Sequence, residues 1–274
     1  METISSYLPL LAFMLAIGAF AGVIAGLLGV GGGIVLVPAF FYLFSSLGYG
    51  GDQVMQLCLG TSLATIVVTS IRSLHSHHKK GAVDWDILKI WSIFISVGAI
   101  IGGFTASELR SDVLQAIFGG LGILVGLYLG FGRQSWQIAE QMPTGILRSI
   151  LASILGFLSV LMGIGGGSLG VPLMSLHNVA IHRAVATAAG FGLAISVPSL
   201  PGFMMVDIAQ TVRPPFTIGA INLPAFFIII AMTLITTPYG AKLAHALDPK
   251  PLKRVFAVFL IIVAMNMLRK AVGF

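Results

Sequence analysis

Long uncharged stretches alternate with short polar clusters along this chain, and their lengths define the predicted elements. The first stretch without a charge runs from Thr3 to Gly51, and others of roughly membrane length follow almost to the C-terminus. A spanning helix needs about 20 apolar residues, so most stretches predict one helix each. The predicted segments are 7–28, 34–47, 53–71, 87–107 and 113–131, then 146–163, 168–178, 184–204, 216–238 and 252–268. The predicted fold is therefore an all-α, polytopic membrane protein.

Two glycine clusters interrupt this apolar pattern. As one helix, the stretch from Thr3 to Gly51 would be about 70 Å long, more than twice the hydrocarbon core. A break is expected at Gly29-Val30-Gly31-Gly32-Gly33, because adjacent glycines lower helix propensity, and another at Gly163-Ile164-Gly165-Gly166-Gly167. The segments that follow, 34–47 and 168–178, reach only about 15 to 20 Å. Each is expected to form a hairpin of half-membrane depth with the helix before it.

The two halves of the chain resemble each other. Gly22 to Pro38 matches Gly156 to Pro172 with glycines and proline in register, and Gly81 to Asp84 matches Gly219 to Asn222. Such self-similarity indicates a tandem duplication. The predicted domains are two transmembrane repeats, residues 5–132 and 145–271. With five segments each, the second repeat would be inverted relative to the first, an arrangement of many secondary transporters whose substrate site lies at the interface.

Composition supports lipid as the solvent of this chain. Hydrophobic residues make up 57% and charged residues 9%, with a mean hydropathy of +1.02, which is outside the range of soluble domains. The net charge of +6 comes from basic residues scattered at segment ends rather than gathered on one face. We therefore expect a lipid bilayer and a small anionic substrate as partners, and no nucleic acid. The sequence predicts no oligomeric state.

Charge asymmetry predicts the orientation. If each short segment returns the chain to its starting side, eleven basic residues share one face and four the other; a continuous kinked span would give nine against six. The positive-inside rule favours the hairpin arrangement, in the inner (plasma) membrane with both termini outside. The eleven are Arg72, Lys79, Lys80, Lys89, Arg133, Arg148, Arg183, Lys242, Lys250, Lys253 and Arg254, and the four are Arg110, Arg213, Arg269 and Lys270.

The glycine clusters are the main candidate site. A helix that starts at membrane depth presents backbone N–H groups with partial positive charge, which suits an anion. Hydroxyl groups nearby could donate further hydrogen bonds. The candidate substrate-binding residues are Gly29, Gly31, Gly32, Gly33, Thr61, Ser62, Gly163, Gly165, Gly166, Gly167, Ser168 and Thr187. The alternative is that the glycines serve close helix packing and the hydroxyls bond within the protein.

Catalytic and metal sites have no support in the sequence. No Ser-His-Asp set or pair of mid-membrane carboxylates can be assembled. His75, His77 and His78 have no Cys or carboxylate beside them and are typical of a solvated cytoplasmic loop. We therefore predict no enzymatic activity, no metal and no cofactor. The single Cys58 excludes a disulfide within one chain.

Several of these motifs together are similar to a known family. The glycine-rich breaks followed by Val-Pro (Gly31 to Pro38 and Gly165 to Pro172), the Leu59-Gly60-Thr61-Ser62 run and the Gly-Ala-Val before Asp84 resemble the TauE/SafE sulfite exporter family, over nearly the whole chain. That resemblance implies transport of sulfite or small organosulfonates, mostly outward, with the duplicated motif near the substrate. The second half departs from the pattern, reading Ala186-Thr187-Ala188-Ala189.

The expected function is secondary export of a small anion. Every acidic residue lies near a segment end, so no proton relay is predicted, and outward movement of an anion could be driven by the membrane potential alone. Two alternatives remain: a membrane assembly protein that transports nothing, in which the glycines serve packing, and a membrane enzyme.

Overall fold

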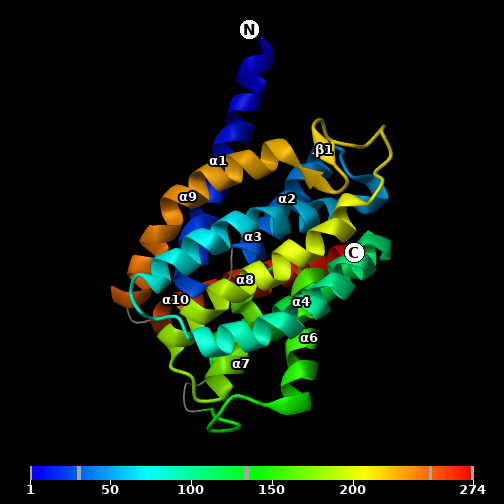
Figure 1. Ribbon diagram of the computed structural model, residues 1–274. Coiled ribbons are helices and arrows are strands. Elements are labelled where there is room, and N and C mark those ends of the chain that lie inside the picture. Colours follow the sequence, from blue (N-terminus) through cyan, green and yellow to red (C-terminus); the bar gives the residue numbers. More distant parts are fainter. Residues whose placement is uncertain (1, 30–31, 133–135, 247–248, 273–274) are drawn as a thin grey trace.

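The computed structural model describes residues 2–29, 32–132, 136–246 and 249–272, and this part of the chain is helical apart from one very short strand pair (Figure 1). The helices of the first half are α1 (Glu2–Leu28), α2 (Gly33–Ser46), α3 (Val54–His78), α4 (Trp85–Glu108) and α5 (Ser111–Phe131), with a 3-10 turn at Gly51–Gln53. Those of the second half are α6 (Gly145–Leu161), α7 (Gly167–Leu176), α8 (Ile181–Met204), α9 (Leu223–Ala246) and α10 (Pro249–Ala271). The all-helical prediction is confirmed, and six of these helices are long and apolar enough to cross a membrane.

Three predicted boundaries were wrong by more than five residues. The segment predicted to end at residue 238 continues to Ala246. The segment predicted over 216–238 begins only at Leu223, because β1 (Thr217–Ile218) and β2 (Ile221–Asn222) pair antiparallel across a turn in which Gly219 has a φ of +56°. The segment predicted to end at residue 71 continues to His78. The three neighbouring histidines therefore lie on helix α3 rather than in a loop, and His77 is fully buried.

The centre of the bundle is formed by α3 and α8, which pack against each other. They are the most buried of the spanning candidates, with 83% and 67% of their apolar windows inside the protein. Helix α1 packs on α9, α4 on α6, and α5 on α10. Figure 1 shows α3 and α8 crossing the middle of the molecule, with α9 on one side and α4, α6 and α7 on the other.

Glycines allow these outer pairs to approach closely. A Cβ atom at Gly22 of α1 would lie 2.8 Å from Thr233 Cα of α9, and one at Gly26 would lie 2.7 Å from Ala241 N. In the other pair, Gly98 of α4 faces Ser153 O, and Gly156 of α6 faces Ile95 O, with no room for a side chain. Small residues commonly permit such backbone contact between membrane helices.

Two ends of the bundle are distinguished below: the loop face, which carries residues 79–84, and the strand face, which carries residues 205–222. Helix α1 ends near the loop face, where Gly26 O lies 3.0 Å from His77 Nε2. Helix α2 returns to the strand face, where Gly50 N donates to Val212 O at 2.7 Å. Helices α1 and α2 therefore form a hairpin that returns the chain to the strand face. Because α1 extends almost to the loop face, which is further than predicted, only α2 of this pair is of half-membrane length.

Candidate functional site

The two glycine breaks meet inside the bundle. Gly33 begins α2, and a Cβ atom there would press on Gly163 O and lie 2.9 Å from Ile164 Cα in the other break. It would also lie 2.8 Å from Ile66, at the middle of α3. The break at the start of α7 lies against α8, since a Cβ atom at Gly166 would be 2.8 Å from Ala188 O. Both short helices therefore begin near the centre of the protein, as expected from the sequence.

Backbone geometry explains why glycine occupies several of these positions. Gly29, Gly32 and Gly163 have φ angles of +68°, +82° and +62°, in the left-handed region that side chains rarely adopt. Gly29 ends α1 against Val185 O of α8, and Gly163 lies against Leu59 of α3. Of the other predicted glycines, Gly165 and Gly167 are buried in the second break, and Gly31 lies outside the described residues.

Ser168 is the predicted site residue whose side chain has no partner in the structure. It is the second residue of α7 and only 3% exposed, and its Oγ accepts and donates no hydrogen bond. A buried hydroxyl without a partner costs about 1–3 kcal/mol. The first turn of a helix also presents unpaired N–H groups with partial positive charge. This hydroxyl and these N–H groups together form a set of donors suited to an anion.

The other predicted hydroxyls bond within the protein. Thr61 Oγ1 accepts a hydrogen bond from Asn222 N at 3.0 Å, and Thr187 Oγ1 accepts one from Asp84 N at 2.9 Å. Ser62 Oγ donates to Gly163 O at 2.8 Å. All three side chains are completely buried. They connect the central helices to their neighbours and to the second break.

Asp84 and Asn222 have structural roles that the sequence analysis did not identify. Asp84 Oδ1 accepts from Ile87 N at 3.1 Å, and Asn222 Oδ1 accepts from Ala225 N at 3.0 Å. Each side chain therefore caps the helix that follows, α4 or α9, as Asp and Asn commonly do. The signal was present in the sequence, because both residues end a matching Gly-Ala-x-Asx run directly before an apolar segment.

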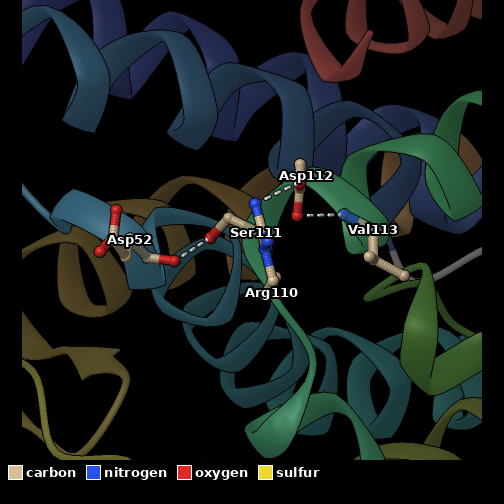
Figure 2. Close-up of polar contacts among 5 residues, drawn as sticks. All are labelled: Asp52, Arg110, Ser111, Asp112 and Val113. Carbon is tan, nitrogen blue, oxygen red and sulfur yellow. Dashed lines mark hydrogen bonds and ion pairs between the residues drawn. The ribbon is translucent and has the colours of Figure 1, made fainter.

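A polar cluster on the strand face fixes the start of α3. Ser111 Oγ donates to Asp52 O at 2.7 Å and accepts from Met55 N at 3.1 Å, as the view in Figure 2 illustrates for the first contact. The same figure shows the ion pair between Arg110 and Asp112, 2.9 Å apart. This pair is exposed and contributes about 1 kcal/mol at most. The buried serine contact is therefore the part of the cluster that positions the central helix.

Comparison with known proteins gives the following similarities. The family model described as "Sulfite exporter TauE/SafE" matches residues 14–267. A probable membrane transporter protein of Haemophilus influenzae is 32% identical over 256 residues, which cover 93% of this chain and 97% of the relative. Another of Methanocaldococcus jannaschii is 26% identical over 263 residues, covering 96% and 97%. No solved structure matches the chain significantly.

Proposed function

Since this chain belongs to the TauE/SafE sulfite exporter family and is a multi-pass membrane transporter rather than an enzyme, we propose that it exports a small oxyanion through a site between the two glycine breaks. The observation that carries this proposal is the convergence of the N-termini of α2 and α7, with the unpartnered hydroxyl of Ser168. Sulfite or a small organosulfonate is the substrate class. The backbone N–H groups of the breaks bind it, from among Gly31, Gly32, Gly33, Gly165, Gly166 and Gly167. Gly29 N and Gly163 N already donate to Ala25 O and Val160 O, so these two glycines shape the breaks rather than donate to the anion.

Thr61, Ser62 and Thr187 belong to the same site in this proposal, as residues that hold its walls. Their hydroxyls bond to Asn222, Gly163 and Asp84 respectively. The site therefore lacks a symmetric pair of free hydroxyls, in agreement with the different sequences after Thr61 and Thr187.

The proposed site lies between two inverted repeats, residues 5–132 and 145–271. Matching contacts support this relation: α1 packs on α9 as α6 packs on α4, and Thr61 bonds to the cap of α9 as Thr187 bonds to the cap of α4. Likewise, Gly29 lies against Val185 and Gly163 against Leu59. The directions of the first helices also support the proposed inversion, because α1 runs from the strand face and α6 from the loop face.

We propose that the membrane potential drives export from the cytoplasm across the inner membrane. Within the described part of the chain, no Asp or Glu side chain is buried, so none of these carboxylates is placed to relay protons through the interior. The potential contributes about 2.3 kcal/mol per charge per 100 mV. For a dianion at about 150 mV this amounts to roughly 7 kcal/mol, which is sufficient for export against a steep gradient.

Flux measurements in proteoliposomes test this function. Purified protein should move sulfite or a small sulfonate in the direction set by an imposed potassium–valinomycin potential. Flux that ignores the potential but follows a pH gradient would show that protons are coupled. If no anion of either kind moves, the transport proposal itself is wrong.

Ser168→Ala tests the position of the site. The loss of one hydrogen bond to a charged group costs about 1.5–3 kcal/mol, so KM should rise at least about tenfold. Thermal stability should be equal or higher, because the hydroxyl has no protein partner. Ser70→Ala is the matched control, since its Oγ is also buried and unpartnered but lies against Gly192, and it should leave KM unchanged. Equal KM values for the two variants would place the site elsewhere.

A further inference from the structure

A cavity of about 280 Å³ lies beside α7, on the side of the loop face. Its described walls come from the end of α5, the end of α7 and the start of α8, with Gly132 and Gln137, and include Tyr128, Ser175, Asn178 and Ile181. At about 30 Å³ per water molecule, its volume corresponds to roughly nine waters. It is therefore large enough for a small organic molecule.

The walls of this cavity combine uncharged polar residues with apolar surface. Ser175 Oγ is buried and has no hydrogen-bond partner, and Tyr128 and Asn178 are also among the lining residues. Gln137 Nε2 donates to Asn178 Oδ1 at 2.8 Å, which already occupies that acceptor. No Asp or Glu is among the lining residues, and the start of α8, uncapped by a side chain, adds N–H groups with partial positive charge. These groups suit an oxyanion that carries an apolar body.

The unpartnered hydroxyl in the cavity lies on the same face of α7 as the one at the break. Ser168 and Ser175 are seven residues apart, close to two full turns, with Val171 between them. Their positions are separated by about 10 Å along the helix. Both oxygens are buried without a partner. The cavity and the proposed anion site therefore lie along one face of α7, with Ser175 and Val171 in the cavity wall and Ser168 beyond them.

The first half fills the corresponding position. In the register of the proposed repeats, on which this step rests, Ile34 and Phe41 of α2 replace Ser168 and Ser175, while Lys270 replaces Gly132. Phe41 is 5% exposed, and Lys270 Nζ lies 5.2 Å from the centre of its ring. The strand face thus has a phenylalanine and a lysine where the loop face has a serine and a glycine. At the positions that correspond to this cavity wall in the proposed repeats, the strand face therefore has larger side chains than the loop face.

We infer that this cavity is a second binding site, which takes a small organic anion from the loop face before the anion reaches Ser168. This inference adds an earlier binding step to the proposed function. It rests on that function only for the later movement of the anion from the cavity to Ser168. The oxyanion is held by the hydroxyls and the start of α8, while the apolar body contacts residues such as Val171 and Ile181.

Cysteine labelling tests the site without requiring transport. Cys58, the chain's only cysteine, is fully buried, so the unmodified protein is the blank. In oriented vesicles, Ala180→Cys, at an exposed position of the cavity wall, should react with a membrane-impermeant maleimide from the side that labels Lys79→Cys, and from that side alone. Benzenesulfonate should slow this reaction at least about fivefold, while the neutral analogue benzenesulfonamide should not. No reaction, reaction from the opposite side, or equal effects of the two compounds would overturn the inference.

Ser175→Phe tests the path by introducing the residue that the first half has at this position. We expect benzenesulfonate flux to fall at least tenfold with thermal stability retained. Ser149→Phe, at an exposed position of α6 where the hydroxyl bonds only within its own helix, is the matched control. Wild-type flux in Ser175→Phe would overturn the path. Absence of flux in the unmodified protein would instead contradict the proposed function, and the labelling result would still decide the site.

Discussion

At the scale of single residues, the buried hydroxyls fall into two groups. Thr61 and Thr187 accept hydrogen bonds from the backbone N–H groups of Asn222 and Asp84, the first buried and the second partly buried. Ser168 and Ser175 have buried oxygens without any partner. The first group stabilises the fold, whereas the second retains hydrogen-bonding capacity for a ligand.

Replacing the threonines should therefore reduce stability. Thr61→Val and Thr187→Val keep the shape but leave one buried N–H unpaired, which should lower the free energy of unfolding by about 1–3 kcal/mol each. Thr61→Ser and Thr187→Ser should retain most of the free energy of unfolding of the unmodified protein. Thermal unfolding in detergent measures the effect, with Thr105→Val as control, because that exposed hydroxyl bonds to Ile101 O in its own helix. Equal unfolding of Thr61→Val and Thr105→Val would contradict this role.

At the scale of elements, helix pairs are held by close backbone contact rather than by long side chains. Gly22 and Gly26 of α1 face α9, and Gly98 of α4 and Gly156 of α6 face each other's helices. In lipid, where apolar side chains gain little from leaving the surroundings, such contact is a main source of helix association. The glycines at these positions, which lie outside the two breaks, therefore serve packing of the four helices.

Gly156→Leu should prevent the contact between α6 and α4. The new side chain would meet Ile95 O, so we expect strongly reduced accumulation of folded protein. Gly120→Leu is the control, since nothing lies within 4 Å of a Cβ atom at that position of α5. Fluorescence-detected size-exclusion chromatography of tagged variants measures the amount of folded protein. Similar yields from both variants would show that the α4–α6 contact adapts to a larger residue.

At the scale of the whole molecule, the hairpins determine on which side each connection lies. Helices α1 and α2 return the chain to the strand face before α3 crosses, which corresponds to the hairpin arrangement that the charge asymmetry favours. Of its eleven basic residues, Arg133 lies outside the described residues. The loop at Lys79 and Lys80 should then be cytoplasmic.

Reporter fusions test this orientation. Alkaline phosphatase, which is active only outside the cytoplasm, should be inactive when fused after Lys80 and active when fused at the C-terminus. Green fluorescent protein at the same positions should give the complementary result. Phosphatase activity at Lys80 would reverse the orientation, and inactivity at both positions would contradict the hairpin arrangement.

The sequence predicted the helices better than their contacts. Charge-free stretches and glycine clusters located all ten helical segments, since both signals are local. The start of α9 was misplaced because Phe216, Ile218 and Ile221 are apolar although they lie in the turn and strand pair before it. The threonine partners could not be predicted, since Thr61 and Asn222 are 161 residues apart and meet only through the packing of two halves. The contrast between Ser175 and Phe41 was also present in the sequence, but it could be interpreted only from the cavity that Ser175 lines.

The pairing of α1 with α9 also has a consequence for synthesis at the ribosome. Roughly 200 residues separate these helices, and at 5–20 residues per second α9 emerges about 10 to 40 s after α1. During that interval the glycine face of α1 is in the bilayer without its final neighbour. Lipids, the insertion machinery or a membrane chaperone must cover this face until α9 has been synthesised. Helix α1 thus enters the membrane long before it reaches its native contacts.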